Sequence, residues 1–183
     1  MKIAICGKMC SGKTTLANTI KIMDPRYEIF SLGQPIKELA TEYFDMKYKD
    51  RDLLISIGTK MREIDPNVWT KYLIKTIAQK THVIIDDLRY QNEYDILRKH
   101  GFVFIQLIVS PHIQEQRIRK LYTKNATIHL NKLSHESETN TFVWAEKHRP
   151  KLVIDNSETA NVVMQRIHSF LQKNENDIQE YSS

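Results

Sequence analysis

Near its N-terminus the chain reads Gly7-Lys8-Met9-Cys10-Ser11-Gly12-Lys13-Thr14, which matches the phosphate-loop pattern G-x-x-x-x-G-K-[ST] in full. The apolar residues 2–6 before this loop are typical of a buried strand, and residues 15–20 after it are typical of a helix. Strand, glycine-rich loop and helix follow one another in the order that the pattern requires. The stretch therefore predicts an α/β fold in which this loop binds phosphate groups.

Each defined position of the loop has a physical role in holding phosphates. Gly7 and Gly12 permit backbone angles and a close approach that a side chain would block. Lys13 is expected to reach the β- and γ-phosphates of ATP, and the Thr14 hydroxyl is expected to bind Mg²⁺. The predicted ATP-binding residues of the loop are Gly7, Lys8, Cys10, Ser11, Gly12, Lys13, Thr14 and Thr15.

The composition is that of one ordinary globular domain. The chain has 183 residues, of which 27% are charged and 41% are hydrophobic. No apolar run approaches the ~20 residues of a membrane-spanning helix, and the short apolar run after Lys2 does not resemble a signal peptide. The two cysteines, Cys6 and Cys10, are too few for a disulfide framework and are expected to be reduced. We therefore expect a cytoplasmic protein without membrane contacts, with a single domain over residues 1–183.

The net charge of +5 has two interpretations. A basic surface can bind nucleic acid, and a basic cleft can bind small polyanions such as nucleotides. The basic residues are spread along the chain and are interrupted by acidic ones, which favours the second interpretation. We therefore expect no stable binding to nucleic acid. The sequence leaves the oligomeric state open, with a homodimer as one option.

Strands and helices are predicted to alternate along the rest of the chain. The predicted strands, including the first, cover residues 2–6, 27–30, 82–87, 102–109 and 152–154. Helices are predicted from Pro35, over 51–57, after 65–67, over 90–100, from Pro111 and from Ser157. Such alternation is typical of a three-layer α/β/α fold, with a five-stranded parallel sheet and helices on both faces.

Three segments modify this regular alternation. Residues 34–79 form an insertion between the second and third strands, where small kinases with a phosphate loop bind their acceptor. Residues 112–140 contain a helix and then a polar stretch, and we expect a lid there. Gly58 is expected to end the helix that begins at Arg51, and the polar residues 173–183 are expected to form a frayed tail.

Two carboxylates stand at the end of the third predicted strand. Asp86 and Asp87 follow the apolar residues 83–85, and the carboxyl ends of parallel strands gather at one edge of a sheet. An enzyme with a phosphate loop needs a carboxylate there to orient Mg²⁺, so we predict a metal site of Thr14, Asp86 and Asp87. Strand geometry favours Asp86, and the other interpretation is a pair of acids that cap a helix. Arg89 is predicted to neutralise a phosphate, with a surface cation as the alternative.

Further candidates lie in the predicted insertion and lid. Arg62 can bind a monophosphate, and Trp69 can either stack on a base or pack in the core. Arg117 and Arg119 precede the polar stretch and are expected either to close over ATP or to form a solvated helix face. The histidines are not spaced like metal ligands, so no zinc site is expected.

Three further blocks of the sequence resemble the deoxynucleoside monophosphate kinases of large viruses and phages. The first is similar to the family's R-x-L-L…G-x-x-x-R…W and consists of Arg51-Asp52-Leu53-Leu54, Gly58-Thr59-Lys60-Met61-Arg62 and Trp69. The second is similar to D-V-R-F-P-N-E and consists of Asp87-Leu88-Arg89-Tyr90-Gln91-Asn92-Glu93. The third is similar to H-x-S-E and consists of His135-Glu136-Ser137-Glu138. The resemblance covers residues 1 to 160 or so.

The resemblance implies ATP-dependent phosphorylation of a deoxynucleoside 5′-monophosphate to the diphosphate, which would support dNTP supply for DNA synthesis. It implies the fold of a nucleoside monophosphate kinase, and it favours Asp87 where strand geometry favours Asp86. Together with the loop, the expected catalytic residues are Lys13, Arg62, Asp87 and Arg89. The expected substrate-binding residues are Arg62, Trp69, Arg89, Glu93, His135 and Glu138. Leu88 and Tyr90-Gln91 depart from the family's Val and Phe-Pro, which leaves the base preference open.

Two other functions are compatible with the sequence. One is a kinase of the same fold that acts on another small molecule, such as phosphomevalonate, dephospho-coenzyme A or a sugar. The other is a nucleotide-dependent switch, because Asn131-Lys132-Leu133-Ser134 begins like the guanine-binding motif N-K-x-D. Ser134 stands where an aspartate would pair with guanine, and the motif follows no predicted strand. The switch is therefore the weaker alternative.

Overall fold

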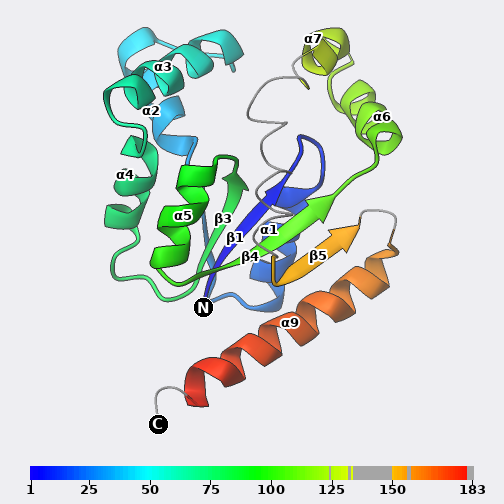
Figure 1. The fold of residues 1–183 in the computed structure, drawn as a ribbon. Helices are drawn as coiled ribbons and strands as arrows, with labels where there is room; N and C mark the ends of the chain where they lie inside the picture. The colour runs from blue at the N-terminus through cyan, green and yellow to red at the C-terminus, as the bar shows by residue number, and fades with distance from the viewer. Residues whose placement is uncertain (124, 132, 134–149, 156–157, 181–183) are drawn as a thin grey trace.

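The protein is built on a five-stranded sheet in which every neighbouring pair of strands is parallel (Figure 1). The computed structural model describes residues 1–123, 125–131, 133, 150–155 and 158–180. The strand order is β2-β3-β1-β4-β5. The strands are β1 (Lys2–Gly7), β2 (Glu28–Phe30), β3 (Val83–Leu88), β4 (Phe102–Ile108) and β5 (Leu152–Asp155). The predicted five-stranded parallel sheet is confirmed.

The strand β1 lies at the centre of the sheet because its side chains are apolar toward both faces. Its residues Ile3, Ala4, Ile5 and Cys6 are fully buried, and the neighbouring strand β3 begins with the fully buried residues 83–85. A strand that is buried on both faces has a continuous apolar run rather than an alternating one. These two strands are therefore the ones that the sequence pattern identifies most clearly.

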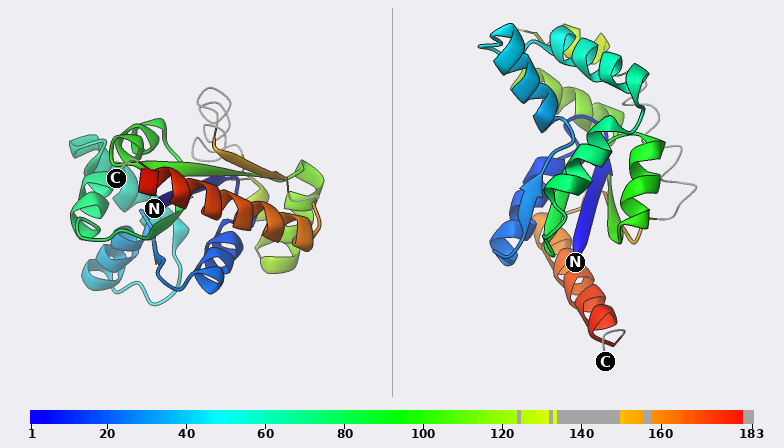
Figure 2. Two further views of the ribbon diagram at one scale, coloured as in Figure 1. Left: turned by 90° about the horizontal axis from the view of Figure 1, so that it is seen from below. Right: turned by 90° about the vertical axis from the view of Figure 1, so that its left-hand side faces the viewer.

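Helices cover both faces of the sheet (Figure 2). On one face, α1 (Lys13–Met23) and α9 (Ala160–Glu180) contribute Leu16 and Ile167 to a buried apolar cluster. On the other face, a second cluster includes Ile36, Trp69 and Leu97. The helices that supply it are α2 (Gln34–Phe44), α4 (Val68–Thr76) and α5 (Gln91–Lys99). The two clusters are the cores of a three-layer α/β/α fold, as predicted.

Three more helices extend beyond the carboxyl ends of the strands. They are α3 (Arg51–Ile64), α6 (Pro111–Leu121) and α7 (Ala126–Asn131). In Figure 1, α2 and α3 stand on one side of the loop that follows β1, and α6 and α7 stand on the other side. The loop is therefore flanked by the two segments in which the sequence predicts an insertion and a lid. Within the described residues, no helix combines the length and the apolar character that crossing a bilayer requires.

The predicted end of α3 at Gly58 is wrong, because the helix passes through the glycine and ends at Ile64, shortly before Pro66. Gly58 serves close packing instead. A Cβ atom at this position would lie 3.1 Å from Nη1 of Arg62 and 3.3 Å from Cδ1 of Ile36. The missing side chain thus leaves room for the guanidinium of Arg62 and for the contact between α3 and α2.

The predicted frayed tail at 173–183 is also wrong in part, because α9 continues to Glu180. The helix is anchored where that stretch begins. The side chain of Asn174 is buried, and its Oδ1 accepts a hydrogen bond from Nζ of Lys151, just before β5, at 3.4 Å. Ser157, the predicted cap of this helix, lies outside the described residues.

Candidate active site

The loop after β1 has the backbone that its two glycines permit. Gly7 has φ +152°, and a Cβ atom there would lie 2.7 Å from both the Leu107 carbonyl oxygen and the Ser11 hydroxyl. Gly12 has φ +98° and precedes the first residue of α1. A larger residue at either position would distort the loop. The loop therefore turns tightly enough to direct the N-terminal amides of α1 toward a bound anion.

The ammonium group of Lys13 closes this loop on itself. Its Nζ donates hydrogen bonds to the carbonyl oxygens of Gly7 at 2.7 Å and Lys8 at 2.8 Å. The side chain is therefore already placed across the mouth of the loop. A positive charge fixed beside several backbone amides is suited to hold phosphate oxygens.

The helix α6 holds the other part of the loop through side chains that reach loop carbonyls. Gln114 is buried and donates to the Met9 carbonyl at 2.8 Å, and Arg117 donates to the Cys10 carbonyl at 3.1 Å. Arg119 lies elsewhere on the helix and forms an exposed ion pair with Glu115 at 2.6 Å. Of the two predicted lid cations, only Arg117 is thus next to the phosphate loop. Arg119 has the solvated position that the sequence left as its alternative.

Thr14 and Asp86 meet at the point where α1 begins and β3 ends. The Thr14 hydroxyl donates a hydrogen bond to Oδ2 of Asp86 at 2.7 Å. Burial raises the pKa of the Asp86 carboxyl, the bond from Thr14 counteracts this rise, and the nearby charge of Asp87 adds to it. A hydroxyl oxygen and a carboxylate oxygen that lie next to each other are hard ligands of the kind that Mg²⁺ prefers. The pair therefore fits a magnesium site next to the phosphate loop.

The shape of this site agrees with how Mg²⁺ is held in nucleotide-binding proteins. No group of three or more His, Cys, Asp or Glu side chains able to hold a metal occurs among the described residues. Mg²⁺ in such proteins takes one or two protein ligands and completes its shell with phosphate oxygens and water. Thr14 and Asp86 would be the protein ligands in such an arrangement.

Asp87 contacts the residues just before α2. Its carboxylate accepts hydrogen bonds from the Ser31 hydroxyl at 2.6 Å and from the backbone N–H groups of Leu32 and Gly33, both at 2.8 Å. Gly33 precedes α2 and has no side chain to cap that helix, so Asp87 provides a cap from β3. The structure thus gives the oxygens of Asp87 a contact with the start of α2 that the sequence does not predict, while its role toward the metal stays a prediction.

Replacing Asp87 with asparagine is expected to destabilise the protein by about 1–3 kcal/mol, because the amide cannot accept all three hydrogen bonds. The start of α2 should shift with the loss of these bonds. Urea denaturation measures the loss of stability. Asp95→Asn is the matched control, because Asp95 is exposed and bonds only Gln91 on its own helix. An unchanged stability in Asp87→Asn would contradict the assigned capping role.

A cleft of about 450 Å³ extends from the phosphate loop to the inner sides of α2 and α3. Its lining contains more basic than acidic side chains. The basic ones are Lys13, Lys37, Lys49, Arg51, Arg62 and Arg89, and the acidic ones are Asp86, Asp87 and Glu93. The excess of positive charge is suited to bind an anion in addition to the phosphates at the loop.

Two lysines that line this cleft, Lys37 and Lys49, belong to no sequence pattern. Lys37 and Lys49 form no hydrogen bond or ion pair with the residues that the structure describes. The pKa of Lys49 is lowered by burial of its ammonium group and by the positive charges of Arg51, Lys37 and Arg89. Mutual repulsion of this kind arises where cations converge on one place, and a bound anion would relieve it. Because the cations come from separate elements, only the folded chain brings them together.

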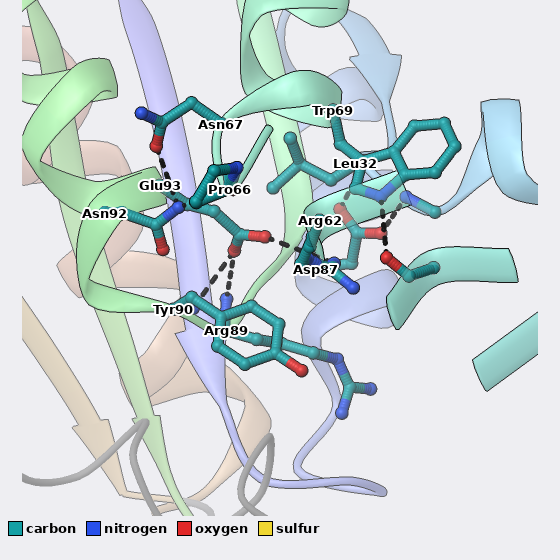
Figure 3. A network of polar contacts seen from close by, with 12 residues as sticks. Leu32, Arg62, Pro66, Asn67, Trp69, Asp87, Arg89, Tyr90, Asn92 and Glu93 are labelled. Atoms are coloured by element: carbon teal, nitrogen blue, oxygen red, sulfur yellow. Dashed lines mark hydrogen bonds and ion pairs between the residues drawn. The ribbon is translucent and has the colours of Figure 1, made fainter. Parts of the chain in front are cut away.

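Arg62 on α3 and Glu93 on α5 both line the cleft and form an ion pair (Figure 3). Nη2 of Arg62 lies 3.7 Å from Oε1 of Glu93. The guanidinium also stacks over the ring of Tyr90, with its carbon 4.7 Å from the ring centre. The predicted residues Arg62, Arg89 and Glu93 all line the cleft. Tyr90, which the sequence marks only as a departure from the related family, lines it too.

Trp69 does not contact the cleft. Its side chain is only 4% exposed and lies in the core cluster with Ile36, and its indole N–H donates to the Gly58 carbonyl at 3.4 Å. The prediction that Trp69 stacks on a base is wrong, and the alternative of core packing is correct. His135 and Glu138, two further predicted substrate contacts, lie outside the described residues.

Comparison with known proteins gives a family match over most of the chain. The model of a family described as AAA domain matches residues 3–143. A comparison with curated protein sequences gives no significant match. The sequence relationship therefore rests on the family model.

Several solved structures of small kinases have the same fold. A gluconokinase from Sinorhizobium meliloti 1021 has a TM-score of 0.63 at 14% identity, over 100% of this chain and 97% of that chain. A deoxyadenosine kinase from M. mycoides, with the products dCMP and a flexible dCDP bound, has a TM-score of 0.62 at 20% identity, over 94% of this chain and 100% of that chain. The APS kinase of Mycobacterium tuberculosis, in complex with AMPPNP and APS, has a TM-score of 0.58 at 11% identity, over 93% of this chain and 98% of that chain. At these identities the likeness shows the fold of small P-loop kinases.

Proposed function

The chain belongs to the AAA domain family and has the fold of small P-loop kinases, and from this premise we propose that it transfers the γ-phosphate of ATP to a deoxynucleoside 5′-monophosphate. The products would be ADP and the deoxynucleoside diphosphate. We further propose that it is a deoxynucleoside monophosphate kinase of the type found in large viruses and phages, which the three sequence blocks resemble. It assigns the phosphate loop to ATP and the acceptor end of the cleft to the monophosphate.

The observation that carries this proposal is the position of two cationic regions in one cleft. Lys13 and the loop amides form one region, and the basic residues of α2, α3 and the segment between them line the same cleft, with Arg51 of α3 also contacting Met9 of the loop. Two negatively charged reactants that must meet require such an arrangement, because their mutual repulsion has to be offset in the transition state. An acceptor that already carries a phosphate accounts for the second region better than an uncharged alcohol does.

The carboxylates of the cleft support the same choice of acceptor. Asp86 accepts a hydrogen bond from Thr14, Asp87 caps α2, and Glu93 accepts from backbone amides. All three acidic side chains that line the cleft are therefore engaged. An alcohol acceptor needs a base to remove its proton, whereas a phosphate acceptor is already an anionic nucleophile. A monophosphate thus matches a cleft whose carboxylates are committed to other partners.

In the proposed reaction, an oxygen of the acceptor phosphate forms a bond to the γ-phosphorus of ATP. The bond between that phosphorus and the β,γ-bridging oxygen breaks, and ADP leaves with the electron pair. Lys13 stabilises the negative charge on the β- and γ-phosphates, and Arg62 and Arg89 hold the acceptor phosphate in line. Thr14 and Asp86 would hold Mg²⁺, which would neutralise charge on the phosphate oxygens of ATP.

The comparisons and the charge of the cleft bear on the choice between a nucleoside monophosphate and the acceptor of another small-molecule kinase. The M. mycoides neighbour is a deoxyadenosine kinase with the products dCMP and a flexible dCDP bound, so it shares the deoxynucleoside part of the proposed acceptor, whereas the three sequence blocks point to a deoxynucleoside that already carries a phosphate. The gluconokinase and APS kinase neighbours have comparable similarity. The charge of the acceptor end favours a phosphate-bearing acceptor, so nucleoside monophosphates come first among the candidates.

A panel of acceptors tests the proposal directly. The measurement is ADP release in a coupled assay with the four dNMPs and four NMPs, and with gluconate, shikimate, adenosine phosphosulfate, phosphomevalonate and dephospho-coenzyme A in parallel. We expect release that depends on at least one deoxynucleoside monophosphate. Turnover with one of the other compounds and with no nucleoside monophosphate would select another kinase. Tight nucleotide binding without transfer to any acceptor would instead support a switch.

A further inference from the structure

Glu93 uses its two carboxylate oxygens for two different purposes (Figure 3). Oε2 accepts hydrogen bonds from the backbone N–H groups of Arg89 and Tyr90, each at 3.0 Å, and thereby ties the end of β3 to the first turn of α5. Oε1 instead faces Nη2 of Arg62 at 3.7 Å. Glu93 is only 3% exposed, so little of its carboxylate is accessible to a substrate in the cleft. Its buried position suits it to act on a substrate through another residue.

Two side chains hold the guanidinium of Arg62, and a glycine leaves room for it. Glu93 faces its guanidinium from α5, the ring of Tyr90 lies beneath it at 4.7 Å, and Gly58 on its own helix leaves space for Nη1. A free arginine side chain has several rotatable bonds and loses freedom when it binds a phosphate. An arginine that is confined beforehand loses less on binding, which strengthens the binding of its ligand.

We propose that Glu93 is a positioning residue, whose carboxylate holds the guanidinium of Arg62 over Tyr90 so that it faces the acceptor phosphate. The inference rests on the proposed function for the identity of the acceptor, but the contact between Glu93 and Arg62 does not depend on it. In this proposal Glu93 does not contact the substrate itself but orients Arg62, which does. The carboxylate must be ionised to perform this role, because a protonated carboxyl attracts an arginine only weakly.

The charge state of Glu93 provides a signature of this role. Burial raises the pKa of its carboxyl to about 7, while the bonds from the backbone of Arg89 and Tyr90 act in the opposite direction. The negative charge of Asp87 on β3 raises the pKa further, and the positive charge of Arg62 on α3 lowers it. Glu93 is thus protonated on the acidic side of this value and ionised on the basic side. The hold on Arg62 should weaken as the pH falls from about 8 to about 6.

Glu93→Gln separates the two purposes of the side chain. The single carbonyl oxygen of glutamine can accept from the backbone N–H groups, which leaves its NH₂ group to face Arg62 without attracting it. We expect the acceptor KM to rise about tenfold at pH 8, the loss of one charge-assisted contact, with the KM for ATP within about twofold of the wild type. Glu63→Gln is the matched control, because Glu63 lies on α3 beside Arg62 and, among the described residues, pairs with the exposed Lys60 alone. It should leave both constants unchanged.

A double-mutant cycle distinguishes positioning from a merely structural effect. If Glu93 acts through Arg62, adding Glu93→Gln to Arg62→Ala should change the acceptor KM by less than about twofold. The acceptor KM of the wild type should also rise on acidification more than that of Glu93→Gln, in which the titration of Glu93 is removed while that of the acceptor's phosphate near pH 6 remains. Full additivity of the two substitutions, or equal pH profiles, would overturn the proposal.

A measurement without substrate keeps the inference separate from the proposed function. The Nε–H signal of Arg62 in an NMR spectrum, identified by its loss in Arg62→Lys, should shift with pH between about 6 and 8 in the wild type. It should not shift in Glu93→Gln. A signal that is insensitive to pH in the wild type would overturn the positioning role even if the kinase activity is found. A shifting signal in a protein that phosphorylates no nucleoside monophosphate would support the role and reject the proposed acceptor.

Discussion

Replacing Lys13 with alanine is expected to lower kcat for phosphoryl transfer by about 10²–10³-fold, as is typical when one preorganised donor is removed from a charged transition state. Lys13 carries the positive charge of the phosphate loop, held across its mouth by the Gly7 and Lys8 carbonyls. As the bond to ADP breaks, negative charge develops on the oxygen between the β- and γ-phosphates. The loop amides and α1 remain in the variant, so ATP binding should weaken less than kcat falls.

A lysine at the other end of the same helix provides the control for this variant. Lys21 lies in the last turn of α1, is exposed and does not line the cleft. Lys21→Ala removes the same charge from the protein and should keep the wild-type kcat. Circular dichroism and the thermal midpoint establish that both variants are folded. A folded Lys13→Ala protein with near-normal transfer would refute the proposed kinase reaction.

The parts of the fold that the sequence predicts correctly depend on local patterns. The phosphate loop is a pattern of adjacent residues, and β1 and β3 are continuous apolar runs that need no knowledge of their neighbours. The loop follows the carboxyl end of its strand, and the carboxyl ends of parallel strands gather at one edge of the sheet. The sequence pattern therefore places the pair Asp86-Asp87 near Thr14, and the hydrogen bond between Thr14 and Asp86 at 2.7 Å agrees with that expectation.

Other features depend on which side of an element faces a neighbour. Asp86 and Asp87 are adjacent in β3, so their side chains point to opposite faces of the sheet. One reaches Thr14 and the other reaches the start of α2, and the sequence does not tell which is which. Trp69 similarly lies on a helix whose apolar face could cover either the core or the cleft. In such cases the packing of a distant element decides, so the sequence leaves alternatives.

The roles of Gly58, Lys37 and Lys49 also depend on residues that are distant in the sequence. A glycine inside a helix is ordinarily a candidate for its end, but Gly58 is required because Ile36 and Arg62 come close to it. Lys37 and Lys49 follow no motif, and they gain their role from the positions of α2 and of the segment before α3 in the folded chain. Charge that is gathered from separate elements is visible only once those elements are placed.

Replacing Asp86 with asparagine is expected to raise the Mg²⁺ concentration for half-maximal activity by about 10–100-fold, the usual cost of removing a residue that supports a metal. Asparagine has the same shape and keeps an oxygen that can accept the hydrogen bond from Thr14, so the protein should remain folded. It loses the negative charge that attracts the cation. Titration of activity with Mg²⁺ at saturating ATP measures the change. Binding of ATP in the absence of Mg²⁺ should not weaken, because one negative charge near the phosphates has been removed.

The comparison of Asp86→Asn with Asp87→Asn decides which of the two adjacent carboxylates serves the metal. Both variants lose one charge at the same end of β3, so a general effect of charge would shift the Mg²⁺ requirement equally in both. We expect the shift in Asp86→Asn alone, because the oxygens of Asp87 are directed to the backbone of Leu32 and Gly33. Acidification should imitate Asp86→Asn in the wild type, since burial raises the pKa of Asp86 and the group is protonated at a higher pH than an exposed aspartate. If Asp87→Asn shows the larger increase in Mg²⁺ requirement, the hydrogen bond between Thr14 and Asp86 does not mark the metal site, and the assignment passes to Asp87.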